Sequence, residues 1–193
     1  QKTFDTPAPS NDSCAGAITV GYGVHAYENC SAAHGDVIPC LNSRIYNDVW
    51  YRWVAPHSGP VSMTTCGSNF SGALAIYEGG CPAAPGNTIT CGSYNGECAS
   101  NSAAVSFDAI EGTAYLVRVG GSLFTQEGQG VLNIIDTTPS CLADYNHDFG
   151  VDGDDVIAFF ADWDAGQIAA DVNTDGGVDG DDVIVFFEHW DAG

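Results

Sequence analysis

The C-terminal part of the chain carries one acidic phrase twice, as "DYNHDFGVDGDDVIAFFADWDAG" over residues 144–166 and "DVNTDGGVDGDDVIVFFEHWDAG" over residues 171–193. The two copies are identical at 17 of 23 paired positions. Each copy places Asp or Asn at positions 1, 3, 5, 9 and 12 and glycine at position 7. These residues are Asp144, Asn146, Asp148, Gly150, Asp152 and Asp155, and then Asp171, Asn173, Asp175, Gly177, Asp179 and Asp182. Oxygen atoms spaced in this way along a tight loop can surround a hard divalent cation.

The spacing is that of an EF-hand-type loop, and it predicts two structural Ca²⁺ ions, one in each loop. The simpler alternative is a pair of Asp-Gly turns whose last aspartates only cap helices. Two loops in register favour calcium. Each loop also gathers four carboxylates, whose mutual repulsion opposes folding, so we expect calcium binding to be coupled to folding.

An apolar stripe follows each loop with the spacing of an amphipathic helix of about three turns. Its residues are Val156, Ile157, Phe159, Phe160 and Trp163, and then Val183, Ile184, Phe186, Phe187 and Trp190. Most of these side chains should form a core shared by the two helices. Ten large apolar side chains exceed what a module of about 50 residues can bury. We therefore expect some of them to dock on another surface, either a partner or this chain's own preceding domain.

The paired loops, each leading into a single helix, resemble a dockerin module over residues 142–193. The resemblance implies a protein partner that is itself a β-sandwich. It also implies that positions 10 and 11 of each loop face that partner, which are Gly153-Asp154 and Gly180-Asp181. Position 6 needs a positive φ, which suits Gly176 but not Phe149 of the first loop. We expect strain in the first loop, which Gly150 could partly absorb.

Residues 11–137 have the strand-and-turn pattern of an all-β domain, with short apolar or alternating runs between clusters of Gly, Asn, Ser and Pro. In "DVWYRWVAP" large side chains occupy both faces, as in a central strand of a two-sheet sandwich. The prediction is a jelly-roll-like β-sandwich. The phrases "NDSCAGAI", "NDVWYRWVAPHSGPVSMTTCGSNFSGALAIYEGGC" and "FDAIEGTAYLVRVGG" resemble bacterial secreted domains related to the pre-peptidase C-terminal domain. That resemblance implies an accessory or binding module.

Eight cysteines without a C-x-x-C pair predict a disulfide framework formed in an oxidising compartment. Cys81 and Cys91 are the most plausible local pair, and Cys141 could tie the tail back to the sandwich. The predicted organisation is an extended N-terminal arm over 1–10, a sandwich over 11–137, a linker over 138–141 and the dockerin-like module over 142–193. The arm is either a flexible tail or a strand added to a neighbouring subunit.

The formal net charge is −21, of which residues 138–193 contribute −14 without a single Lys or Arg. Such a charge argues against nucleic-acid and anionic-membrane binding. No apolar run is long enough to span a membrane, and no catalytic motif is present, so we expect no enzyme activity. Because the sequence begins at Gln1, we expect a mature secreted or cell-surface form without its signal peptide.

The sequence supports two functions. The first is a non-enzymatic extracellular structural or assembly protein, whose calcium-loaded tail docks onto a β-sandwich. If that sandwich belongs to an identical copy, the copies would join head to tail into a homopolymer, which would form a filament or a surface appendage. The alternative is a carbohydrate-binding or accessory module anchored to a scaffold through its tail. Its candidate aromatics are Trp50, Tyr51 and Trp53, although their place in a central strand favours core packing.

Overall fold

The computed structural model describes residues 7–34, 37–38, 43–81, 83, 85–93, 102–138 and 141–191. The chain forms two compact units, Gln1–Thr138 and Pro139–Gly193. The predicted arm falls mostly outside the described residues, since only 7–10 of it are described, and so do positions 139–140 of the predicted linker. No helix of the described residues is long and apolar enough to cross a membrane.

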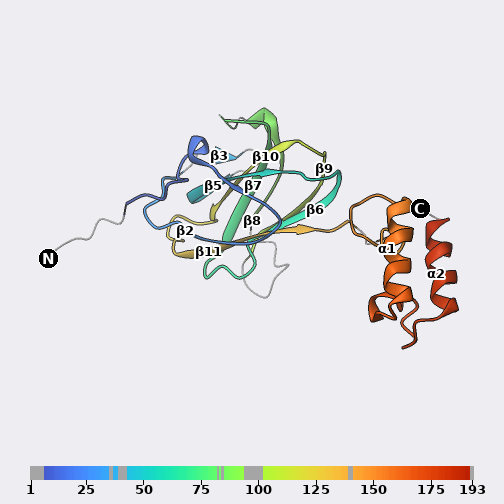
Figure 1. Cartoon of the computed structure of the whole chain (residues 1–193). Coiled ribbons are helices and arrows are strands. Elements are labelled where there is room, and N and C mark those ends of the chain that lie inside the picture. The colour runs from blue at the N-terminus through green and yellow to red at the C-terminus, as the bar shows by residue number, and fades with distance from the viewer. Residues whose placement is uncertain are drawn as a thin grey trace. The chain divides into compact units, whose positions relative to one another are not determined.

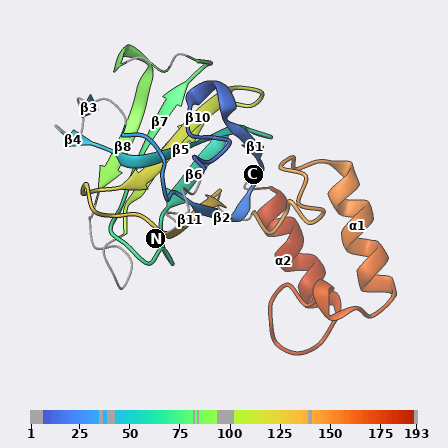
Figure 2. The ribbon, with the colours of Figure 1, turned by 90° about the vertical axis from the view of Figure 1, so that its left-hand side faces the viewer.

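The first unit is a β-sandwich of two main sheets (Figures 1 and 2). One sheet has the order β1-β5-β10-β7-β8, formed by β1 (Ile18–Val20), β5 (Tyr46–Val54), β10 (Ala114–Gly121), β7 (Gly72–Glu78) and β8 (Thr88–Ser93). The other has the order β2-β11-β6-β9, formed by β2 (Gly23–Glu28), β11 (Gln129–Asp136), β6 (Gly59–Thr64) and β9 (Ala104–Ala109). Two short strands, β3 (Val37–Ile38) and β4 (Ser43–Arg44), pair separately, and η1 (Cys14–Gly16) and η2 (Pro85–Asn87) are 3-10 turns. The predicted mainly-β fold is confirmed.

Strand β5 has side chains buried on both of its faces, as its sequence predicts. Tyr51 and Trp53 join the core between the sheets, where Trp53 stacks on Tyr115 at 5.7 Å between ring centroids. Trp50 points to the opposite face and packs in a second cluster with Tyr77. The exposed fractions of Trp50, Tyr51 and Trp53 are 8%, 4% and 0%. The predicted core packing is confirmed, and the alternative that these aromatics form a sugar-binding surface is wrong.

The outer face of the larger sheet holds a buried ion pair. Arg118 Nε donates to Asp48 Oδ2 at 2.8 Å, and Nη2 donates to Oδ1 at 3.2 Å. The guanidinium also lies 5.3 Å from the ring centroid of Trp50. Both charges are almost fully buried, and a buried charge is tolerated when its partner satisfies it in this bidentate way.

The N-terminal segment is fastened onto this same face. Asn11 Nδ2 donates to the backbone carbonyl of Trp50 at 3.0 Å, and Trp50 N donates to Asn11 O at 2.8 Å. A disulfide joins Cys14 to Cys81, with 5.8 Å between the two Cα atoms. The predicted Cys81–Cys91 bond is therefore wrong, because η1 brings Cys14 to Cys81. This bond closes a separation of 67 residues, and such long-range closure restricts the unfolded chain more than a local loop does.

The remaining described cysteines divide into two groups. Cys66 and Cys91 are also disulfide-bonded. Cys30 and Cys141 are free thiols, and both are partly exposed. Four of the six described cysteines therefore take part in the predicted disulfide framework. The expected tie between Cys141 and the sandwich is wrong, since Cys141 forms no disulfide here.

The second unit contains two helices, α1 (Gly153–Asp164) and α2 (Gly180–Trp190), with a 3-10 turn, η3 (Ile168–Ala170), between them. The two helices lie side by side in both views (Figures 1 and 2). Trp163 near the end of α1 donates its indole N–H to the carbonyl of Asp179 at the start of α2, at 2.8 Å. Phe159 and Phe186, in the middle of each helix, stack at 4.4 Å. The helices are therefore antiparallel.

Candidate functional site

The first acidic loop is closed by hydrogen bonds from its own backbone. Asp148 N donates to Asp144 Oδ1 at 3.0 Å and to Asn146 Oδ1 at 2.8 Å. Phe149 N donates to the other oxygen of Asp144 at 3.1 Å. Gly150 N donates to Asp148 Oδ1 at 2.9 Å, and Asn146 Nδ2 donates to Asp148 Oδ2 at 2.9 Å. Positions 1, 3 and 5 therefore lie on the inside of one tight turn.

The second loop repeats this network bond by bond. Asp175 N donates to Asp171 Oδ1 at 3.1 Å and to Asn173 Oδ1 at 2.9 Å. Gly176 N donates to Asp171 Oδ2 at 3.0 Å, and Gly177 N donates to Asp175 Oδ1 at 2.9 Å. The sequence repeat is thus a repeat in structure, down to which oxygen accepts which N–H group.

The aspartates at position 12 link each loop to its helix. Asp155 and Asp182 have exposed fractions of 0%. Asp155 accepts from Asn146 N at 3.0 Å and from Asp152 N at 2.9 Å, and Asp182 makes the equivalent bonds at 3.2 and 2.9 Å. Asp152 and Asp179 are the helix N-caps, and each forms a capping box with its position-12 aspartate. Backbone N–H donors, led by that of Asp179, lower the pKa of the Asp182 carboxyl.

Two positions of each loop adopt a left-handed backbone. At position 4, His147 and Thr174 both have φ of 61°. At position 6, Phe149 has φ of 73° where Gly176 has 96°. The positive φ at position 6 of the first loop is therefore confirmed, but Phe149 adopts it itself. The expectation that Gly150 absorbs part of the turn is wrong, because Gly150 is not among the residues with positive φ.

The donor set of the loops suits a calcium ion in its chemistry, because carboxylate, carboxamide and carbonyl oxygens are the ligands that Ca²⁺ takes. Among the described residues, however, no group of three or more His, Cys, Asp or Glu side chains is gathered as a metal ion requires. The carboxylates of the loops face backbone N–H groups instead of one another. An ionised carboxylate offers about four lone-pair sites, and these bonds occupy only part of them. Calcium binding by the twelve loop residues stays a prediction.

The core of this unit is small and aromatic. Phe159, Phe186 and Ala170 are fully buried in it. The Phe159 and Phe186 rings are parallel within 3° and occupy equivalent positions of the two repeats. Tyr145 packs edge-on against Phe159, and its hydroxyl donates to Asp162 Oδ2 at 2.9 Å. Burial and the Asp162 carboxylate raise the pKa of Tyr145 to about 12.

The surface of the unit keeps several apolar side chains in water. Ile157 and Ile184, at equivalent positions of the two helices, have exposed fractions of 69% and 57%, and Phe187 has 37%. Ile168 and Phe149 outside the helices are exposed by 73% and 52%. Seven of the ten stripe residues thus belong to the core or its edge, while Ile157, Ile184 and Phe187 do not. The predicted surplus of apolar surface is present within this unit.

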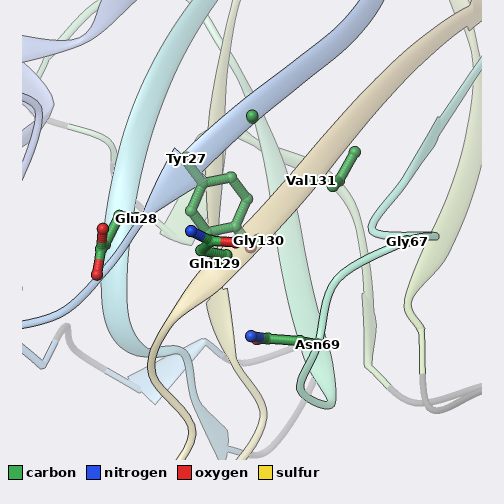
Figure 3. Close-up of a pocket in the computed structure, with 8 residues that line it drawn as sticks. Tyr27, Glu28, Gly67, Asn69, Gln129, Gly130 and Val131 are labelled. Carbon is green, nitrogen blue, oxygen red and sulfur yellow. The ribbon is translucent and has the colours of Figure 1, made fainter.

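A shallow groove lies on the sandwich where β2, β11 and the turn after β6 meet (Figure 3). Its volume is about 440 Å³, and Glu28, Asn69 and Gln129 supply its exposed polar groups. The ring of Tyr27 lies against Gly130, where any side chain would collide with it. Burial raises the pKa of the Tyr27 phenol, and the nearby Ser68 side chain offsets part of that rise. Sequence reasoning missed this groove, because its residues come from three separate segments without a motif.

A polar cluster fastens the end of β11 to the body of the sandwich. His57 Nε2 lies 2.9 Å from Asp136 Oδ2 and 3.2 Å from the Tyr22 hydroxyl. Burial and the Asp136 charge raise the pKa of Tyr22 to about 12. Burial opposes ionisation of Asp136, but the N–H of Thr138 and the nearby His57 lower its pKa. The same ring nitrogen of His57 thus contacts both Asp136 and Tyr22, and the cluster ties the end of β11 to the segment before β2.

No family model and no curated protein matches this chain. Similar solved structures include the pre-peptidase C-terminal domain of a collagenase from Bacillus anthracis, at 13% identity and a TM-score of 0.39, covering 68% of this chain and 99% of that one. PliG, a periplasmic inhibitor of g-type lysozyme from Aeromonas hydrophila, follows at 13% identity and 0.35, covering 62% and 97%. A CBM35 from Cellvibrio japonicus Abf62 has 13% identity and 0.30, covering 56% and 76%. At these values the likeness does not indicate what the chain binds.

The mismatch at position 6 gives a matched pair of substitutions. Phe149→Gly should raise the local stability of the tail unit by up to about 1 kcal/mol, because a non-glycine residue at positive φ is strained. Gly176→Ala should lower it by about the same amount. Hydrogen exchange of peptides within 141–191 in the full chain measures both effects. The control is Gly180→Ala, where φ is not positive and no atom lies within 4 Å of the added Cβ. Equal hydrogen exchange in all three variants would contradict the claim that position 6 favours glycine.

Proposed function

We propose that the chain is a non-enzymatic extracellular structural protein that assembles through its acidic tail. The tail unit binds two structural calcium ions and then docks, dockerin-like, onto the β-sandwich of a neighbouring copy. The result is a head-to-tail polymer, in keeping with a secreted or cell-surface location. The observation that supports this most is the duplicated loop-and-helix unit with equivalent apolar side chains left exposed on both helices.

Calcium would be held in each loop by the residues at positions 1, 3, 5, 7, 9 and 12 named above. When bound, the ion supplies positive charge that offsets the repulsion of four carboxylates within twelve residues. The chain's own part is to hold those carboxylates in place through backbone N–H donors. Because the position-12 aspartate also completes the capping box of its helix, loop closure and helix formation are linked.

The docking surface in this proposal is the exposed apolar face of the two helices. Ile157 and Ile184 are each more than half exposed and occupy equivalent positions. An exposed apolar patch rimmed by charged residues is typical of a protein interaction site. Gly153-Asp154 and Gly180-Asp181 are also exposed, as partner-facing residues must be. The duplication offers two equivalent halves of one contact surface.

The docking proposal is tested with the full chain by sedimentation velocity in calcium and in chelator. The wild type should sediment as a distribution of oligomers in millimolar calcium and as a monomer in chelator. Ile157→Asp with Ile184→Asp should weaken self-association at least tenfold, since burying two carboxylates in an apolar contact costs more than about 1.4 kcal/mol.

The matched control is Ile168→Asp, which places the same charge on an exposed isoleucine outside the two helices. It should assemble like the wild type. A wild-type chain that stays a monodisperse monomer in millimolar calcium would contradict the polymer proposal.

A second candidate function is binding of a neutral saccharide in the groove of Figure 3. Two carboxamides, Asn69 and Gln129, and one carboxylate, Glu28, can pair with sugar hydroxyls as donors and acceptors. The volume lies in the range of small-ligand sites. The lining contains no Lys or Arg, and Glu28 repels anions, so acidic sugars are excluded.

Isothermal titration of the full chain against neutral oligosaccharides tests the groove. Asn69→Ala with Gln129→Ala should weaken binding about tenfold or more, because each lost hydrogen bond contributes about 1 kcal/mol. Asn87→Ala, an exposed asparagine elsewhere on the sandwich, should bind like the wild type. Failure of every neutral glycan to bind, or equal binding by both variants, would remove this candidate.

A further inference from the structure

Two cysteines in the described part of the chain, Cys30 and Cys141, form no disulfide. Among the described cysteines, Cys14 and Cys81 are bonded to each other and Cys66 and Cys91 are also bonded, which indicates an oxidising compartment. Cys30 and Cys141 are free, and each is partly exposed. One belongs to the sandwich and the other to the tail unit. Accessible thiols in such a compartment are expected to find partners.

Cys30 lies at the end of the sandwich where β11 begins. In the β2–β11 ladder Glu28 is opposite Gln129, and Asn29 N continues the pairing by donating to Gly128 O at 3.2 Å. Cys30 follows directly, next to the charges of Glu28 and Glu127.

Cys141 is tethered to the opposite end of the same strand. β11 ends at Asp136, and Thr137 N still donates to Pro60 O of β6 at 3.2 Å. Cys141 comes three residues after Thr138, the last residue of the first unit. Strand β11 therefore separates the anchoring points of the two thiols.

The separation rules out a bond between Cys30 and Cys141 of one chain. The eight residue steps from Gly128 to Asp136 span about 26 Å at the rise of a β-strand. Three residues beyond Thr138 can reach at most about 11 Å, and a disulfide spans at most about 7 Å between Cα atoms. The allowed total of about 18 Å falls well short of the distance, whatever the orientation of the tail unit.

We propose that Cys141 of one copy forms a disulfide with Cys30 of the next copy, which locks the head-to-tail assembly covalently. This inference rests on the proposed docking of the tail on a neighbouring sandwich. Because the tail unit is attached at the end of β11 far from Cys30, each bond leaves a free Cys30 at one end of the growing chain and a free Cys141 at the other. Such a heterologous contact repeats without closing.

Charge disfavours the symmetric bonds. A Cys141–Cys141 bond would join two tail regions that each carry −14, whereas the mixed bond joins −14 to the −7 of residues 1–137. A Cys30–Cys30 bond would bring together two copies of both Glu28 and Glu127 around one disulfide. The mixed bond therefore carries less repulsion than a Cys141–Cys141 bond, and it avoids the crowding of four glutamates that a Cys30–Cys30 bond requires.

The chemistry is thiol–disulfide exchange with an external disulfide as oxidant. The two thiols lose two protons and two electrons and form one S–S bond, while the external disulfide takes up both and is reduced to two thiols. A hydrogen bond to the Glu28 carboxylate, with burial and the charge of Glu127, raises the pKa of the Cys30 thiol. Less thiolate is then present at neutral pH, so the bond should form slowly and faster in alkaline solution.

The test uses the full chain in calcium with oxidised glutathione, followed by alkylation and a non-reducing denaturing gel. The wild type should give a ladder of dimer, trimer and larger species that collapses on reduction. Cys30→Ser and Cys141→Ser should each remain monomeric alone. Mixing these two variants should give dimers and nothing larger, because each chain then carries a single reactive end.

Three results would overturn the inference. Dimers of either single variant alone would indicate a symmetric bond, a monomer with linked Cys30 and Cys141 peptides would indicate an intrachain bond, and a wild type that stays monomeric would indicate none. The double variant Cys30→Ser with Cys141→Ser separates this inference from the proposed function. If sedimentation shows that this double variant still assembles in calcium, the docking proposal stands whether or not the wild type gives a ladder. If the double variant does not assemble, the docking proposal fails even where the wild type gives a ladder.

Discussion

Mutual repulsion among carboxylates is the constraint on which the tail unit depends. Residues 138–193 carry fourteen acidic side chains and neither Lys nor Arg. Two such charges 4 Å apart in water cost about 1 kcal/mol, and more where the surroundings are partly buried. Backbone N–H groups offset part of this cost by pointing at the loop carboxylates. They carry only partial charges, and in the proposed function a calcium ion supplies the remaining positive charge.

The constraint extends from the loops to the helices and their core. Asp155 and Asp182 are buried, and each accepts hydrogen bonds from two backbone N–H groups of its loop. Each also completes the capping box of the helix that follows. The stacked Phe159 and Phe186 come from those two helices and meet only when both are in place. Loss of either loop should therefore unsettle the whole unit. In the sandwich, a buried Arg118–Asp48 pair and the Cys14–Cys81 disulfide join distant segments instead.

Local patterns in the sequence were sufficient where one segment decides the outcome. The repeat spacing predicted both loops and both helices, and the two-faced pattern of β5 predicted a buried strand. Contacts between distant segments were not predictable. Cys14 reaches Cys81 through the fold of η1, and the groove gathers Glu28, Asn69 and Gln129 from three places. Phe149 shows a limit of residue preferences, since the network around Asp144 holds it at a φ that glycine normally takes.

Hydrogen exchange of the full chain with and without calcium tests the central claim most directly. The account predicts that peptides within 141–191 are protected in millimolar calcium and exchange rapidly in excess chelator, while β5, β10 and β7 of the sandwich exchange equally slowly in both. Equal protection of the tail unit with and without calcium would contradict the claim that the ion offsets the carboxylate repulsion.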